Sequence, residues 1–211
     1  MILLLHRRGW IISRLGAAWR DDRAAQLVEF AVALPLLVVF VVGIFDFSGA
    51  FTLKQKLTNI ARDAARAAAT DPATDLANPL ALPASVSDAF QLVDAYLIAN
   101  KINDCGMNIG SYINGPGPIW TFTVTSTSSS PCGIKLIINR GYYFPGGTAS
   151  QPATSTCQSG ALAAAQIQVI STCVSIQYTY QWRFGQVASL LGTAATLPAN
   201  ISGAAVAINE N

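Results

Sequence analysis

The chain has 211 residues, of which 52% are hydrophobic and only 11% are charged, and its mean hydropathy is +0.40. Soluble domains usually carry about a quarter charged residues, so this composition indicates a membrane segment in addition to one ordinary domain. The formal net charge is only +2 and no basic patch follows the apolar stretch, which excludes the charge pattern of a nucleic-acid-binding protein.

The first 23 residues are basic. They contain two acids, Asp21 and Asp22, against five arginines, so their local charge is +3. Positive charge gathers on the cytoplasmic side of membrane helices. We therefore predict that residues 1–24 form a cytoplasmic leader and that the chain after the apolar stretch lies on the other side of the membrane. The arginines are Arg7, Arg8, Arg14, Arg20 and Arg23.

An apolar stretch from Gln26 to Phe47 follows the leader. Sixteen uncharged residues separate Glu29 from Asp46, and flanking apolar residues extend this run toward the about 20 residues that a membrane span needs. We predict a transmembrane helix over about 28–47. Pro35 removes one backbone donor and can kink the helix, which membrane helices tolerate.

A secretory signal peptide is the rival interpretation of this stretch. Ser48-Gly49-Ala50 offers small residues for cleavage, and cleavage after Ala50 would free a secreted soluble protein. Signal cores are shorter, however, and a carboxylate at the start and a central proline do not suit them. The pattern favours an anchor.

Two acids mark the ends of the predicted span. A carboxylate at the hydrocarbon edge costs a few kcal/mol unless it finds a partner, so Glu29 is a candidate functional residue. An interfacial acid in the first turn of a helix, favoured by the helix dipole, is the alternative. Asp46 is interpreted as an interfacial marker only.

The helical pattern continues past the span. No glycine or proline interrupts it between Ala50 and Thr70, and Asp71-Pro72 then supplies a stop, so we predict one long helix over 25–70. Its alanine-rich stripe suits close packing against the chain's own sheet or against neighbouring copies, and both options stay open. The stripe consists of Leu53, Leu57, Ile60, Ala61, Ala64, Ala65 and Ala68.

The segment from Arg23 to Ala69 resembles the TadE-like family of minor pilin-like proteins, which belong to the tight-adherence (Flp type IV) pilus machinery. The tail LPANISGAAVAINEN is a looser match to the terminal strand of that family. The residues that carry the resemblance are Val28-Glu29-Phe30, Pro35-Leu36-Leu37, Gly43-Ile44-Phe45-Asp46-Phe47 and LTNIARDAARAAA from Leu57 to Ala69.

The resemblance implies processing by a prepilin peptidase. The family pattern has glycine before the cut and glutamate at the fifth position after it, which places the cut between Ala24 and Ala25. This sequence departs from the pattern because Ala24 stands where glycine is expected, so cleaved and uncleaved forms both stay open. After a cut, the new α-amino group of Ala25 could pair with Glu29 of a neighbouring subunit, which would remove two desolvation costs and set the axial register.

The remaining chain, 71–211, is predicted to be an exported α+β domain. Residues 72–84 are interpreted as a linker and 101–118 as a loop, because both are rich in turn-forming residues. Between them we predict a helix over about 85–100, capped by Ser85 or Ser87. Its buried side would be formed by Phe90, Val93 and Leu97.

Alternating patterns then predict an antiparallel sheet. Trp120, Phe122 and Val124 mark one strand, Leu136 and Ile138 a second, and Ile201 to Ile208 a last one. The clearest alternation, over 170–184, predicts a long strand with one buried face, and 146–160 is interpreted as an exposed loop. The expected buried face comprises Ile170, Thr172, Val174, Ile176, Tyr178, Tyr180, Trp182 and Phe184.

The cysteines indicate disulfides rather than a metal site. All four follow the apolar stretch, and an even number on the exported side fits two bridges, for which three pairings are possible; free buried thiols are the alternative. No pair has the spacing of a zinc site, and the single histidine, His6, lies in the leader, so we expect no metal, no cofactor and no histidine-based catalysis. The cysteines are Cys105, Cys132, Cys157 and Cys173.

The leading hypothesis is therefore a non-enzymatic, single-pass protein of the bacterial inner membrane, with its N-terminus in the cytoplasm. The resemblance implies that it works in pilus assembly by packing with other pilin-like subunits and the assembly platform, with incorporation into a pilus as one outcome. A permanently anchored envelope protein that binds a partner is the second hypothesis, and the secreted protein is the third.

Overall fold

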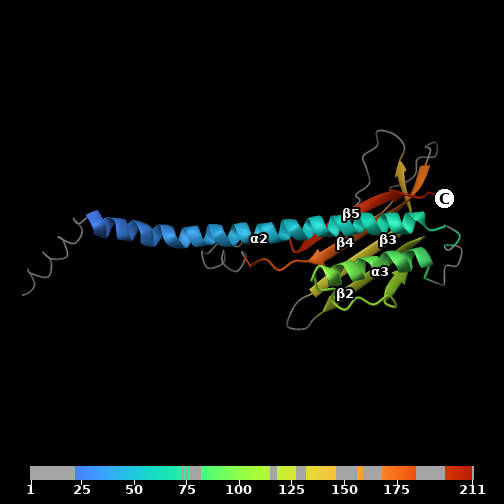
Figure 1. Cartoon of the computed structure of the whole chain (residues 1–211), viewed down its shortest axis with the longest axis horizontal. Helices are drawn as coiled ribbons and strands as arrows, with labels where there is room; N and C mark the ends of the chain where they lie inside the picture. The colour runs from blue at the N-terminus through green and yellow to red at the C-terminus, as the bar shows by residue number, and fades with distance from the viewer. Residues whose placement is uncertain are drawn as a thin grey trace, which may run out of the picture. The chain divides into compact units, whose positions relative to one another are not determined.

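The computed structural model describes residues 22–72, 74, 76, 82–114, 118–126, 132–145, 156–158, 168–183 and 198–210. These residues form the helices α2 (Asp22–Thr70) and α3 (Ala84–Ala99) and five strands (Figure 1). The chain divides into two compact units. One comprises Met1–Phe47 and Trp182–Thr196, and the other comprises Ser48–Gln181 and Leu197–Asn211. The predicted α+β class, a long apolar helix followed by a small antiparallel sheet, is confirmed.

Helix α2 is one continuous element of 49 residues, with Pro35 inside it. It ends at Thr70, as the stop signal predicted, and it begins a few residues before the expected Ala25. The predicted linker over 72–84 lies mostly outside the described residues.

Helix α3 confirms the predicted second helix but not its cap. Pro83 stands at the N-cap in an extended conformation and provides no side-chain hydrogen bond to the helix. The Pro83 carbonyl accepts the backbone N–H groups of Val86 at 3.1 Å and Ser87 at 3.0 Å. The expected serine cap is therefore wrong, because both Ser85 and Ser87 lie inside the helix. The predicted buried side is present and comprises Phe90, Val93 and Leu97.

The five strands form one antiparallel sheet in the order in which they occur along the chain. The edge strand β1 was missed, because the loop predicted over 101–118 contains it. Its three residues give no alternation to detect, and Ile113 is 69% exposed. The strands are β1 (Tyr112–Asn114), β2 (Ile119–Ser126), β3 (Cys132–Pro145), β4 (Gln168–Thr179) and β5 (Asn200–Ile208).

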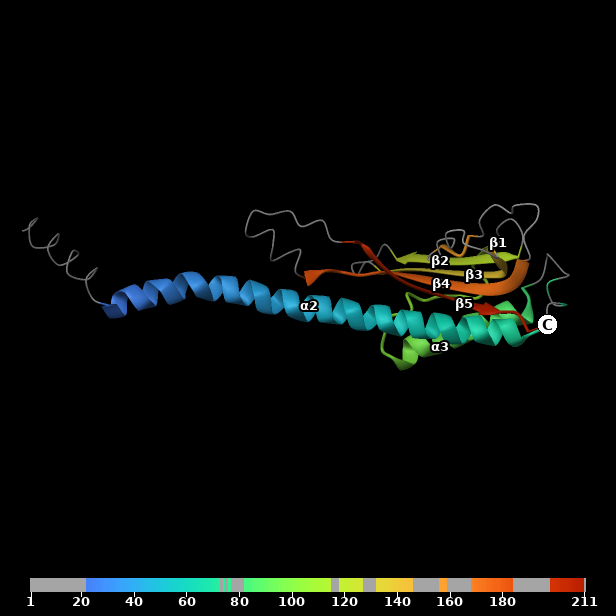
Figure 2. The ribbon, with the colours of Figure 1, turned by 90° about the horizontal axis from the view of Figure 1, so that it is seen from above.

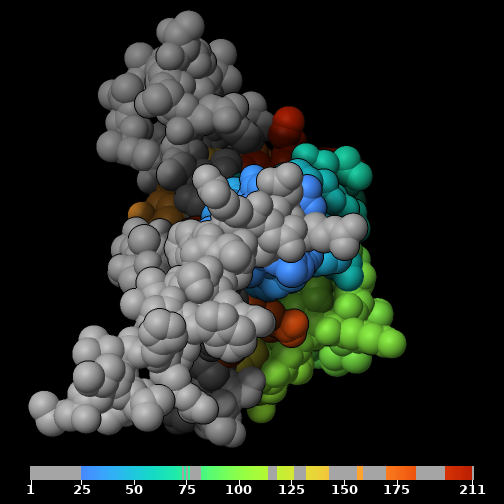
Figure 3. Space-filling view, turned by 90° about the vertical axis from the view of Figure 1, so that its left-hand side faces the viewer, coloured from blue at the N-terminus to red at the C-terminus, as the bar shows by residue number. Residues whose placement is uncertain are grey.

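Helix α3 and the part of α2 that begins at Ser48 cover one face of the sheet (Figure 2). The teal atoms at the end of α2 and the green atoms of α3 lie on the same side of the molecule in Figure 3. The rings of Phe90 on α3 and Phe122 on β2 meet with centroids 4.6 Å apart. On β5, Gly203 touches the backbone of α2, because a Cβ atom there would lie 2.5 Å from the carbonyl carbon of Leu57.

The alanine stripe of α2 is buried within the chain's own fold. Five alanines between Ala61 and Ala69 are at most 2% exposed. The side chains that remain exposed on this part of the helix include the charged Arg62, Asp63 and Arg66. Of the two options left open by the sequence, packing against the chain's own domain is therefore the one observed.

The other face of the sheet holds a second buried cluster, formed by Ile137, Tyr142, Cys157 and Cys173. A β-bulge in β3 shapes it, because the register shifts between Asn139 and Tyr142. The extra residue moves Tyr142 to the face that carries Ile137.

Strand β4 consequently differs from its prediction. The single buried face expected over 170–184 is wrong, since all six residues from Ser171 to Ile176 are buried. The strand ends at Thr179, while Ile170 is 60% exposed and Phe184 lies outside the described residues. The helices cover one face, and the cluster that contains Cys157 and Cys173 lies on the other.

A buried arginine ties the end of α2 to the sheet. Arg140 is 1% exposed, and its guanidinium donates to the Asp71 carbonyl at 2.9 Å and to Thr172 Oγ1 at 3.4 Å. Thr172 Oγ1 in turn donates to Asn209 Oδ1 at 2.7 Å, and Asn209 Nδ2 donates to the Arg140 carbonyl at 3.2 Å. A cation that donates to a carbonyl just past a helix C-terminus is favourable, so this network holds the end of α2 at the sheet.

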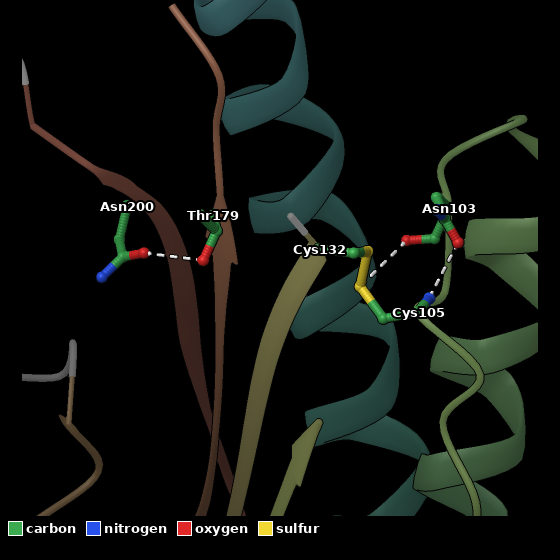
Figure 4. The surroundings of a disulfide bond; sticks show 5 residues. All are labelled: Asn103, Cys105, Cys132, Thr179 and Asn200. Carbon is green, nitrogen blue, oxygen red and sulfur yellow. Dashed lines mark hydrogen bonds between the residues drawn. A yellow bond between two sulfur atoms is a disulfide. The ribbon is translucent and has the colours of Figure 1, made fainter. Parts of the chain in front are cut away.

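Two disulfides close the fold. Cys105 pairs with Cys132, joining the loop after α3 to the start of β3 (Figure 4), and Cys157 pairs with Cys173 on β4. Of the three possible pairings, this is the one that the structure contains. Asn139 Nδ2 donates to the Cys157 carbonyl at 2.8 Å, which also holds the described part (156–158) of the predicted loop over 146–160.

Candidate functional site

The N-terminal half of α2 carries an exposed apolar surface. Fourteen large apolar side chains between Leu27 and Phe51 are 42–75% exposed, and the most apolar 18-residue window of the helix is only 6% buried. The core helix of a soluble domain would hide these side chains. By length and composition this helix can cross a membrane. An apolar helix of this kind near the N-terminus suggests a membrane anchor.

Glu29 lies on this surface. Its side chain is exposed, between Val28 and Phe30, which are 66% and 63% exposed. Within the described part of the chain no hydrogen bond or ion pair engages its carboxylate. The structure therefore leaves Glu29 available to a group outside those residues.

The predicted processing residues lie one turn before Glu29. Ala24 and Ala25 both belong to α2, and Ala25 is exposed; the surroundings of the Ala24 side chain lie outside the description. Pro35 is exposed and the helix continues through it. Ala25, Glu29 and Pro35 thus share one element with the apolar surface and are distant in sequence from the four cysteines.

Asp46 differs from its neighbours on the helix. It is 6% exposed, whereas Phe45 and Phe47 are 75% and 51% exposed. Gly43 and Ala50 are buried too, so the three residues form a stripe at i, i+3 and i+7 on one side of the helix. The interpretation of Asp46 as an interfacial marker took no account of this stripe, which the small residues on either side of the acid could have indicated.

An aromatic contact lies beside this stripe. The rings of Phe47 and Trp182 have centroids 5.3 Å apart with a tilt of 55°. Trp182 was expected on the buried face of a strand, but the strand has ended before it. On the same segment the hydroxyl of Tyr180 would lie 3.0 Å from a Cβ atom at Gly49. The chain after β4 thus runs close to α2, which the alternation in the sequence did not reveal.

The acids of the sheet domain do not form a comparable site. Asp94 on α3 has one buried carboxylate oxygen without a hydrogen-bond partner in the described residues. Burial, and secondarily the nearby Asp104 carboxylate, raises the pKa of Asp94 above its usual range. No group of three or more potential metal ligands occurs among the residues that the structure describes.

Comparison with known proteins bears on α2 alone. The family model described as TadE-like protein matches residues 24–66. This segment is about a fifth of the chain and lies within α2, and the match confirms the resemblance predicted for about 23–69. No curated protein and no solved structure matches the chain significantly.

Proposed function

We propose that this chain is a membrane-anchored, minor pilin-like subunit that acts in tight-adherence pilus assembly. In this proposal residues 1–24 lie in the cytoplasm, 28–47 cross the bacterial inner membrane once, and 71–211 form an exported domain. The TadE-like segment supports a role related to pilus assembly, and proteins of that kind are structural rather than enzymatic.

The observation that carries the proposal is the division of α2 into two halves. After Ser48 the helix belongs to the same compact unit as the sheet, and its alanine stripe is buried in that unit. Before Ser48 nearly every large apolar side chain is exposed. Lipid and the corresponding helices of other pilin-like subunits are the partners that suit such a surface, because tight packing between apolar helices is what associates them in a bilayer.

Glu29 would give this packing its register. If the chain is cut before Ala25, the new α-amino group is a cation one helical turn from the carboxylate. Pairing it with Glu29 of an adjacent subunit spares both charges an unpaired position at the hydrocarbon edge. If the chain is not cut, Ala24 stays amide-linked, and the subunit remains an anchor without that pairing.

The mature N-terminus separates the competing functions. Mass spectrometry of the protein isolated from membranes should give Ala25 for a processed pilin-like subunit, Met1 for a permanent anchor and Phe51 for a secreted protein. The last form is disfavoured because a carboxylate at the start of the apolar run and a central proline do not suit a signal core.

Replacing Glu29 tests the assembly role directly. Glu29→Ala should abolish incorporation into pilus assemblies, measured by cross-linking to other subunits, while the chain still fractionates with the membrane. Glu29→Gln isolates the charge, and Gln26→Ala is a matched control on the neighbouring exposed turn. Normal cross-linking by Glu29→Ala and Glu29→Gln would show that charge pairing does not set the register.

A further inference from the structure

We infer that the chain has a second contact with the membrane, formed by Trp182 and Arg183 beside Phe47, which binds the lipid headgroup region. This inference rests on the proposed function, because it takes α2 to cross the bilayer. It adds that the segment after β4, and not only the helix, holds the chain at the membrane surface.

The geometry of the aromatic pair is the first argument. The Phe47 and Trp182 rings are in contact, with centroids 5.3 Å apart, yet Phe47 remains 51% exposed and Trp182 is only half-buried. The two rings therefore present a joint apolar surface that remains partly exposed.

The position of the pair points to lipid as the surroundings of this exposed surface. Phe47 is the last residue of the predicted span over 28–47, so the contact lies where the helix would leave the hydrocarbon. Tryptophan is enriched at this level of membrane proteins, because the ring is apolar while its N–H needs a polar neighbour. The next residue, Arg183, is exposed and can place its guanidinium among lipid phosphates while its stem covers apolar surface.

The surroundings agree with a lipid surface. Ile44, Phe47 and Phe51 share one side of α2 at i, i+3 and i+7, and Ile44 and Phe51 are 68% and 64% exposed. This apolar helix side and the exposed Arg183 are compatible with the boundary between hydrocarbon and headgroups.

Depth-dependent fluorescence quenching tests the inference on the full-length chain. Trp10, Trp19 and Trp120 are replaced by phenylalanine, and the protein is reconstituted in vesicles of phosphatidylcholine and phosphatidylglycerol. These vesicles contain lipid spin-labelled either near the headgroup or near the end of the acyl chain. Trp182 emission should be quenched at least about twofold more by the shallow label than by the deep one, because an interfacial ring lies at the headgroup level.

A reference position makes the two proposals separable. Phe40 is 63% exposed. It precedes Phe47 by seven residues and therefore lies about 10 Å deeper in the proposed membrane span. Phe40→Trp, placed in a chain whose other tryptophans including Trp182 are phenylalanine, should prefer the deep label. If Phe40→Trp is quenched by the deep label and Trp182 by neither, the second contact is wrong and the membrane span stands.

Two further outcomes are informative. If neither Phe40→Trp nor Trp182 is quenched, the membrane span itself is wrong. Stronger quenching of Trp182 by the deep label would place the ring in the hydrocarbon and overturn the headgroup assignment. Because Trp120 is buried in the sheet domain, the measurement is repeated as the difference between the unsubstituted chain and Trp182→Phe, which needs no core substitution.

Discussion

The contact between β5 and α2 gives a sharp prediction for Gly203→Ala. A Cβ atom at this position would lie 2.5 Å from the carbonyl carbon of Leu57 and from the nitrogen of Thr58, and 2.8 Å from the Leu57 carbonyl oxygen. All three are backbone atoms of a helix, so no side chain can rotate away to make room. The strand and the helix would have to separate.

The magnitude follows from how far they must move. Ordinary contacts between non-bonded carbon atoms begin near 3.5 Å, so a separation of about 1 Å is needed, and a gap of that size forfeits up to roughly half of each contact it opens. Overpacking of a core costs about 1–3 kcal/mol, and a clash with immovable backbone belongs at the upper end. Alanine lowers the conformational entropy of the unfolded chain relative to glycine, which offsets about 0.4–1 kcal/mol of this cost. The expected net loss in the free energy of unfolding is about 2 kcal/mol.

Thermal unfolding of the full chain in detergent, followed by circular dichroism, measures this loss. For a chain of this size about 2 kcal/mol corresponds to a midpoint lower by roughly 4–8 °C. Gly110→Ala is the matched control, because a Cβ atom there would meet only the Asn108 side chain, at 3.4 Å. Equal midpoints for the two variants would refute the close approach of α2 to β5.

Two other predictions concern the sheet domain. Peptide mapping without reductant should yield Cys105 joined to Cys132 and Cys157 joined to Cys173, and Cys157→Ala with Cys173→Ala should cost about 3 kcal/mol in denaturant unfolding; any mixed pairing would contradict the structure. Because the pKa of Asp94 is raised in the folded state, its contribution to stability is greatest below the unfolded pKa and is lost as pH rises through the folded pKa. Asp94→Asn should therefore raise the unfolding midpoint at neutral pH but not at low pH, whereas Asp88→Asn, an exposed acid on the same helix, should show no such difference.

The helices were predictable because their signals are local. The long apolar run, the uninterrupted alanine pattern and the Asp71-Pro72 stop each act within a few residues, and α2 ends as they predicted. The start of α3 was misjudged because serine is a frequent cap, whereas here the extended backbone of Pro83 offers its carbonyl instead.

The sheet was less predictable because its burial depends on distant segments. The alternation over 170–184 indicated one buried face, but Cys173 on the second face is buried in a cluster to which its disulfide partner Cys157, distant in sequence, also belongs. The bulge that redirects Tyr142 leaves no recognisable mark in the sequence. Nor could a single sequence reveal that the chain after β4 returns to α2 at Phe47.

The division of α2 also restricts how copies of this chain could meet. A pilin-like subunit whose helix were apolar throughout could slide along a neighbouring subunit, because two uniformly apolar surfaces pack equally well at many axial offsets. Here the helix from Leu57 onward packs against the subunit's own sheet and carries exposed charged side chains on its other side, so the apolar surface that is open to packing lies between Leu27 and Phe51. Between Leu27 and Phe51, Glu29 is the acid that is exposed, since Asp46 is buried. One charged position on a short apolar surface is enough to select one offset among many, which is the physical reason why the proposed function gives the register to Glu29.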